Sequence, residues 1–332
     1  MHEWNIMCYT FTDNDLEVGS FKDLAKLTSI NTQYHNVIIH MIIDTATMGS
    51  YLIKIRGNPY MDNMMTIKRL PNQDMSKCET LCHFIQDSVK DAPANRYALI
   101  LGGHGSGWLL LTEKDSVLPV AKLADILRQC KLPNNKIFDL ICFDNCMMST
   151  LESINELRNI AKYVVAYQDY SGWDGIIEPT LIKHFDDPTK STLEIAKELA
   201  KSVIIKTNQK LSDPTNENKP DPTDVSVICM QQIPNIVTWI TKNVPLKRPL
   251  NNQYCVDPTY WHLQDLMSIV KHSYSDIQEF TDLFNQVVVF YQQSSNKHNP
   301  LHHGLSCIVD PEKDTFDTQH TWKLLSLRLI FV

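Results

Sequence analysis

The chain has 332 residues, of which 43% are hydrophobic and 21% are charged, an ordinary composition for a globular protein. A chain of this length can bury a large core without disulfide or metal support. Its formal net charge of −7 argues against nucleic acid as the main partner. No apolar run reaches the ~20 residues that a membrane span needs, so we expect no membrane partner.

The nine cysteines are odd in number and scattered, and several lie within apolar runs, which is typical of reduced, buried thiols. Cys78, Cys82 and His83 lie close together in the chain, but no second Cys/His pair follows at zinc-finger spacing, which disfavours a metal site. The first 17 residues lack the basic and apolar segments of a secretory signal. We therefore expect an intracellular protein, or a secreted one if an N-terminal segment is missing from this chain.

Apolar runs and helical spacing predict the elements in chain order. The first half reads as strands over 4–11 and 36–43, a hairpin within 51–70 that turns at Gly57, Asn58 and Pro59, a helix over 75–91, a strand over 97–101, a helix over 119–130, a strand over 138–143, a helix over 147–161 and a strand over 163–167. The second half reads as a helix over 192–210, a strand over 225–230, a mostly helical stretch over 256–295 and a last strand within 304–311. This alternation predicts an α/β fold with a mostly parallel central sheet covered on both faces.

One polar, proline-rich loop, "SDPTNENKPDPTD" at 212–224, interrupts the pattern. It lies between a core over 1–211 and a C-terminal part over 224–332 that adds strands to the sheet and is otherwise largely helical. A domain boundary at this loop is one interpretation. The alternative is one continuous domain in which this loop lies on the surface.

Two segments that follow predicted strands carry chemistry. "GGHGSGW", which contains His104, follows the strand at 97–101, and "DNCMMS", which contains Cys146, follows the strand at 138–143. Ligands of parallel sheets bind beyond the carboxyl ends of the strands. A thiolate is the competent sulfur nucleophile, and a helix N-terminus or an imidazolium stabilises it. Glycines beside the histidine would allow backbone N–H groups to approach a developing oxyanion.

Other interpretations of these segments remain open. A glycine-rich loop after a strand can bind phosphate, but this one lacks the spacing of a P-loop or of a dinucleotide-binding fold. Cys146 could be a buried thiol at the start of a helix, and Cys142 reads as a core residue of its strand.

The segments "YTFTDNDLE", "PANRYALILGGHGSGW", "FDLICFDNCMMSTLES" and "YVVAYQDYSGWDG" together resemble the clostripain-type cysteine peptidases of the caspase–gingipain–legumain superfamily. The resemblance runs through most of the chain, and it implies a caspase-like three-layer α/β/α sandwich. It places the catalytic histidine on His104, the nucleophile on Cys146, and the oxyanion-binding N–H groups on Gly105 and Cys146.

The resemblance also implies cleavage after arginine or lysine, with acidic residues in the S1 pocket. Asp144 matches the acid two positions before the cysteine, and strand periodicity independently turns residues 144 and 146 the same way. A second acid would be Asp174, with Asp169 less favoured. Three acids near the first strand, Asp13, Asp15 and Glu17, read as a solvated turn or its caps.

The sequence departs from the family pattern at several positions. Asn145 stands where alanine is frequent and is expected to crowd the site, and Gln168 and Asp169 replace a common Ser-Glu pair. The short separation of His104 and Cys146 puts maturation by cleavage between them in doubt. No cofactor is required by the sequence, although the resemblance allows calcium.

The sequence therefore predicts a cysteine endopeptidase that acts on peptides or proteins with a basic P1 residue through a Cys-His dyad and a thioester acyl-enzyme. A catalytically silent, peptidase-like binding protein is the first alternative. A nucleotide-binding α/β protein is the second.

Overall fold

The computed structural model describes residues 2–28, 36–56, 64–113, 116–171, 175–176, 182–216, 219–243, 254–256, 262–297, 299–309 and 321–327. The predicted turn at Gly57, Asn58 and Pro59 lies outside these residues.

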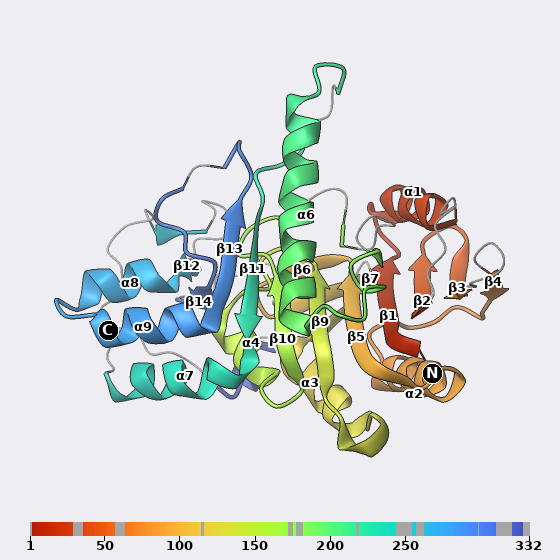
Figure 1. The fold of residues 1–332 in the computed structure, drawn as a ribbon, viewed down its shortest axis with the longest axis horizontal. Coiled ribbons are helices and arrows are strands. Elements are labelled where there is room, and N and C mark those ends of the chain that lie inside the picture. Colours follow the sequence, from red (N-terminus) through yellow and green to blue (C-terminus); the bar gives the residue numbers. More distant parts are fainter. Residues whose placement is uncertain are drawn as a thin grey trace.

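A nine-stranded sheet forms the centre of the molecule, in the order β13-β11-β10-β9-β5-β1-β2-β3-β4 (Figure 1). Its strands are β1 (His2–Thr12), β2 (Val37–Thr45), β3 (Gly49–Arg56), β4 (Met64–Arg69), β5 (Ala94–Gly102), β9 (Phe138–Asp144), β10 (Ala161–Ala166), β11 (Asp224–Cys229) and β13 (Val288–Gln293). The inner strands β10, β9, β5, β1 and β2 run parallel, and the strands at both edges pair antiparallel. The carboxyl ends of the inner strands therefore meet at one edge of the sheet.

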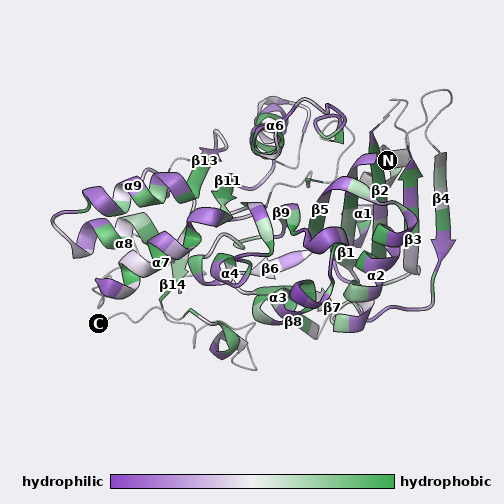
Figure 2. Ribbon diagram, turned by 60° about the horizontal axis from the view of Figure 1, so that its bottom comes forward, coloured by the Kyte–Doolittle hydropathy of each residue, from purple (hydrophilic) through white to green (hydrophobic). Residues whose placement is uncertain are grey.

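Helices cover both faces of this sheet and complete three layers (Figure 2). The helices are α1 (Glu17–Thr28), α2 (Cys78–Asp91), α3 (Val120–Gln129), α4 (Leu151–Glu156), α6 (Thr192–Ser212), α7 (Ile233–Lys242), α8 (Leu266–Ser273) and α9 (Gln278–Val287). Two small sheets stand outside the main one, β6 (His104–Ser106) with β7 (Leu109–Glu113) and β8 (Ser116–Pro119), and β12 (Leu263–Asp265) with β14 (Ser306–Ile308).

The strands are apolar on both sides, so each face has its own core. One core joins Tyr9 and Leu99 to the helices α2, α3 and α4, and it continues to α7, α8 and α9. The other joins Ile6 and Leu140 to α6. Cys142 is completely buried in this second core, as its place in the strand predicted. Successive residues of one strand serve opposite cores because side chains alternate across a strand.

The structure confirms the predicted three-layer α/β fold with a mostly parallel central sheet. The expectation of a mostly helical stretch over 256–295 is wrong at both ends, because β12 and β13 flank α8 and α9. β11 and β13 extend the main sheet beyond the proline-rich loop, whereas β14 pairs with β12 in the small sheet.

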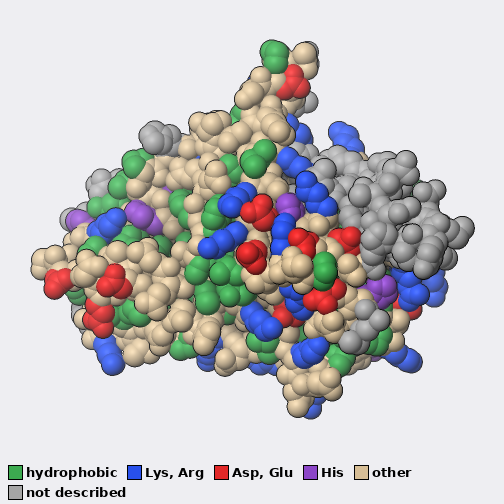
Figure 3. All heavy atoms as spheres, viewed as in Figure 1, with side chains coloured by type: hydrophobic (Ala, Val, Ile, Leu, Met, Phe, Trp, Pro, Cys, Tyr) green, Lys and Arg blue, Asp and Glu red, His purple; other side chains and the backbone are tan. Residues whose placement is uncertain are grey.

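The surface carries charges of both signs. On the face seen in Figure 3, basic and acidic side chains are interspersed over the middle of the sheet rather than separated into patches. No helix in the described part of the chain combines the length and apolarity that crossing a bilayer would take.

Candidate active site

The segments that carry His104 and Cys146 lie side by side at the carboxyl edge of the sheet. β5 and β9 pair in parallel up to Gly102 and Asp144. Just beyond, the Gly103 N–H donates to the Asp144 carbonyl at 3.4 Å. The buried Asn145 amide donates to the Gly103 carbonyl at 2.8 Å and to the His104 carbonyl at 3.4 Å. Asn145 thus ties the two segments together.

Two glycines allow this close approach. A Cβ at Gly105 would lie 2.8 Å from the Cys146 carbonyl oxygen and 2.8 Å from the Asn145 Cβ. Gly103 has a φ of +142°, and a Cβ there would lie 2.3 Å from the Phe11 ring. A side chain at Gly105 would push the histidine segment away from the cysteine segment, and a side chain at Gly103 would collide with Phe11 of β1.

The helix expected over 147–161 begins only at Leu151, with Thr150 as its N-cap. Residues 147–149 are instead bound to neighbouring strand ends, with the Met147 N–H donating to the Asp169 carbonyl at 2.8 Å and the Ser149 N–H to the Tyr167 carbonyl at 2.9 Å. Met147 adopts a left-handed backbone, with φ at 62°. Cys146 therefore does not open a helix, and the expected stabilisation of its thiolate by a helix N-terminus is wrong.

Ser171 supplies the polar contacts of the thiol. Its backbone N–H and its hydroxyl both lie 3.4 Å from the half-buried Cys146 Sγ. Burial raises the pKa of the Cys146 thiol, and the two contacts with Ser171 partly oppose that rise. Sequence reasoning missed Ser171, because nothing in "YSGWDG" marks this serine as a neighbour of a cysteine 25 residues before it.

His104 is paired with an acid from the first turn of the chain. Its Nε2 lies 2.7 Å from the Asp15 Oδ1, across 89 residues of sequence. Asp15 follows β1, which is the neighbour of β5, so both residues reach the same edge of the sheet. The hydrogen bond from His104 lowers the pKa of the Asp15 carboxyl. Asp15 is thus an exposed turn residue, as expected, but it also contacts His104, which the sequence did not predict.

Asp144 ends β9 two residues before the cysteine, and its side chain is half-buried. Its Oδ2 accepts the Ile176 N–H at 2.8 Å. Gly175 has a φ of +54°, and a Cβ there would lie 2.6 Å from the same oxygen. The segment after Ser171 therefore returns to Asp144. Asp174 lies outside the described residues.

Asp169, the less favoured acid, is already paired with a cation of the protein itself. The buried Lys297 ammonium lies 2.6 Å from Asp169 Oδ2 and 2.8 Å from Asp224 Oδ2. Nearby charges of the two carboxylates raise the pKa of Lys297 against the effect of its burial. An acid that is paired with a buried lysine is unsuited to bind a substrate cation.

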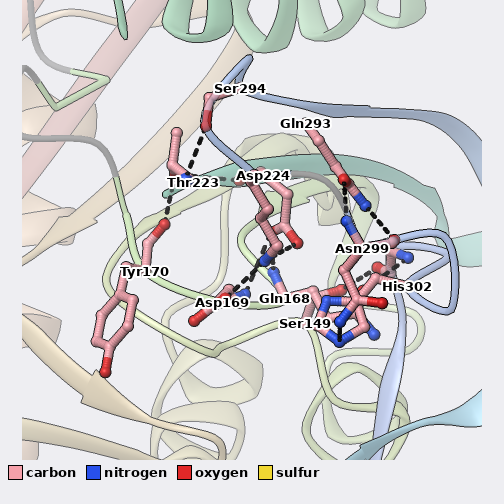
Figure 4. A network of polar contacts seen from close by, with 12 residues as sticks. Ser149, Gln168, Asp169, Tyr170, Thr223, Asp224, Gln293, Ser294, Asn299 and His302 are labelled. Carbon is pink, nitrogen blue, oxygen red and sulfur yellow. Dashed lines mark hydrogen bonds and ion pairs between the residues drawn. The ribbon is translucent and has the colours of Figure 1, made fainter. Parts of the chain in front are cut away.

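A polar network around Asp224 holds the segment that carries Ser171 (Figure 4). The Gln168 and Asp169 N–H groups donate to Asp224 Oδ1 at 2.9 and 3.2 Å. The Thr223 hydroxyl donates to the Tyr170 carbonyl. Both ends of this segment are thereby fixed to the start of β11.

The described residues contain no group of three or more His, Cys, Asp or Glu side chains arranged to hold a metal ion. Cys78, Cys82 and His83 therefore do not form such a group.

Comparisons with known proteins show which family the chain belongs to. The model of the clostripain family, Peptidase_C11, matches residues 8–308. No curated protein is significantly similar in sequence. Among solved structures, a secreted C11 cysteine protease from Bacteroides thetaiotaomicron in complex with an irreversible peptide inhibitor superimposes with a TM-score of 0.78, at 18% identity over 97% of both chains.

Two further structures show the same fold. An inactive zymogen C11 protease from Parabacteroides distasonis has a TM-score of 0.72 at 18% identity, over 93% of this chain and 92% of its own. A second secreted C11 cysteine protease from B. thetaiotaomicron, "iotapain", has a TM-score of 0.74 at 13% identity, over 92% and 93%. The family match covers the strands, the glycine-rich segment and the cysteine segment together, and the chain belongs to the clostripain family of cysteine peptidases.

Proposed function

We propose that the protein is an endopeptidase that cleaves after arginine or lysine, with Cys146 as nucleophile and His104 as general acid and base. The observation that carries this proposal is the junction at the sheet edge, where Asn145 ties the histidine segment to the cysteine segment and the Asp144 carboxylate lies two residues from the thiol.

The reaction follows from these groups. The Cys146 thiolate attacks the peptide carbonyl carbon, and the C–N bond breaks as His104 gives a proton to the leaving amine. The product is a thioester on Cys146. His104 then takes a proton from water, the hydroxide attacks the thioester carbonyl, and the C–S bond breaks to release the carboxylate product and the thiolate.

The oxyanion that forms in each half of the reaction needs N–H donors. We assign this role to the backbone N–H groups of Gly105 and Cys146. The absence of a side chain at Gly105 supports the assignment, because the backbone there packs directly against the Cys146 carbonyl.

Asp144 is the acid that we assign to the S1 pocket. The Ile176 N–H orients its carboxylate, and a guanidinium or ammonium beside it would make charge-assisted hydrogen bonds. Asp174 stays a candidate for the second acid. The structural relative described with an irreversible peptide inhibitor fits a peptide substrate, and the intracellular location expected from the sequence stays a prediction.

The test is hydrolysis of matched fluorogenic peptides that carry arginine, lysine or a neutral residue at P1. Cys146→Ala should abolish all hydrolysis. Asp144→Asn should lower kcat/KM for the basic peptides by about 30-fold or more, and for the neutral peptide far less, because truncating one partner of a desolvated ion pair costs roughly 2–5 kcal/mol.

Asp125→Asn is the matched control, since Asp125 is an exposed acid on α3 that pairs with Arg128. It should leave all three rates unchanged. Equal losses on all peptides in Asp144→Asn would make Asp144 structural. If the wild type binds the peptides but does not cleave them, the silent binding protein replaces the enzyme. Thermal stabilisation by a nucleotide would favour the nucleotide-binding alternative.

A further inference from the structure

We propose that Asp15 is a positioning residue for catalysis, which fixes the ring of His104 so that its Nδ1 is the nitrogen that transfers protons. This inference rests on the proposed function of His104 and extends the dyad by a third group. In the D-N-x-L-E pattern of residues 13–17, Asp15 stands at the variable position, so the pattern itself gives it no role.

The geometry supports this role in two ways. The 2.7 Å contact joins Asp15 Oδ1 to Nε2, and a carboxylate can only accept, so Nε2 carries the proton. Within the described part of the chain, Nδ1 has no hydrogen-bond partner. A neutral His104 held in this way presents the Nδ1 lone pair, which can take a proton from water. A protonated His104 presents an Nδ1–H, which can protonate a leaving amine.

The Asp15 side chain is 81% exposed and the His104 side chain 34% exposed. An exposed ion pair stabilises a fold by little, so the contact contributes orientation rather than folding energy. Two hydrogen bonds hold the segment that carries Asp15. The Leu16 N–H donates to the Asn14 side chain at 2.9 Å, and the Thr47 hydroxyl, 30 residues away, donates to the Glu17 carboxylate at 2.7 Å. These bonds fix the turn that carries Asp15 next to His104.

The test compares two substrates with the same basic peptide, one an anilide and one a thiobenzyl ester. The anilide needs a proton on its leaving nitrogen, whereas the thiolate of the ester leaves without one. Asp15→Ala should lower kcat/KM for the anilide by about tenfold, a loss of about 1.4 kcal/mol of transition-state stabilisation. It should lower kcat/KM for the ester by less than about threefold. Asp15→Glu, which keeps a carboxylate, should recover most of the anilide activity.

Asp13→Asn is the matched control, because it removes a charge from the same turn without a contact to His104. It should change neither rate. Equal losses on anilide and ester in Asp15→Ala, or no loss on either, would overturn the inference. A wild type that hydrolyses neither substrate, or a Cys146→Ala variant that hydrolyses both, would instead overturn the proposed function.

Discussion

Asn145 shows how a single side chain can serve a different purpose from the one its position suggests. The resemblance to the family implies alanine at this position, and a larger residue is expected to crowd the site. In the structure its amide turns to the Gly103 and His104 carbonyls. Asn145→Ala should therefore lower the free energy of unfolding by about 1 kcal/mol, the usual cost of one buried hydrogen bond. Urea unfolding measures this, and a rise in kcat/KM would instead support crowding.

Ser171 lies directly against the Cys146 thiol. Its hydroxyl contact lowers the pKa of the Cys146 thiol, so Ser171→Ala should raise that pKa further. Because the thiolate is the reactive form, alkylation by iodoacetamide would then set in at higher pH and be slower at pH 7. Mass spectrometry of the Cys146 peptide follows the rate, with the exposed Cys78 as an internal control. An unchanged pH profile for Cys146 would show that the hydroxyl does not act on the thiol.

At this scale the sequence predicted that the segments of His104 and Cys146 meet at one edge of the sheet, but it did not predict the side chains that contact them. His104 and Cys146 were identifiable because each follows a buried strand, and parallel strands end at one edge. Asp15 and Ser171 lie in turns whose local pattern is that of a solvated loop. Their roles depend on which strands are neighbours in space, and strand order is not encoded in the periodicity of any one segment.

The segment from Gln168 to Ser171 is held in place by side chains that lie far away in the sequence. Lys297, whose side chain is 5% exposed, pairs with Asp169 and Asp224, which are 8% and 0% exposed. Lys297→Met would leave two buried carboxylates without a cation and should lower the free energy of unfolding by about 3–5 kcal/mol. Lys201→Met is the matched control, because Lys201 makes an exposed pair with Glu198 and should cost less than about 0.5 kcal/mol. Similar losses in the two variants would contradict a buried, mutually dependent cluster.

The elements that periodicity misread have a common cause. β13 (Val288–Gln293) follows α9 without an intervening loop. An apolar run of this length does not distinguish a short strand from another helical turn. Residues 147–150 directly precede the apolar residues that show helical spacing, yet their backbone is bound to the residues that follow β10 and to Ser306. In both places pairing with a distant strand decides the backbone. The long buried strands β1, β5 and β9 were predictable because their sequences are apolar on both sides.

For the whole molecule, one buried acid sets a pH dependence of stability. Glu152 is 1% exposed, and burial raises the pKa of its carboxyl to about 8. Its Oε1 accepts the Ile308 N–H at 3.1 Å, which links α4 to the small sheet of β12 and β14. The folded protein therefore holds a proton that the unfolded chain loses near pH 4.5. The free energy of unfolding should fall between about pH 4.5 and about pH 8, by up to roughly 1.4 kcal/mol per pH unit.

Glu152→Gln cannot ionise and keeps an oxygen for the Ile308 N–H. Its free energy of unfolding should fall by about 2–3 kcal/mol less than that of the wild type between pH 5.5 and pH 7.5. Urea unfolding at the two pH values gives this double difference. Parallel changes in wild type and variant would show that Glu152 does not carry the dependence.

The division into residues 1–211 and 224–332 stays a prediction.

The pairing of Asp169 with Lys297 also determines when, during translation, the segment of Ser171 can be fixed in place. The ribosome adds β1, β5, β9 and β10, and with them His104 and Cys146, early in translation. Lys297, which holds the segment of Ser171, is added 128 residues after its partner Asp169. A growing chain therefore contains His104 and Cys146 before it contains the cation that pairs with Asp169 and Asp224. A chain released before residue 297 would therefore lack the cation that holds the segment of Ser171 beside the Cys146 thiol.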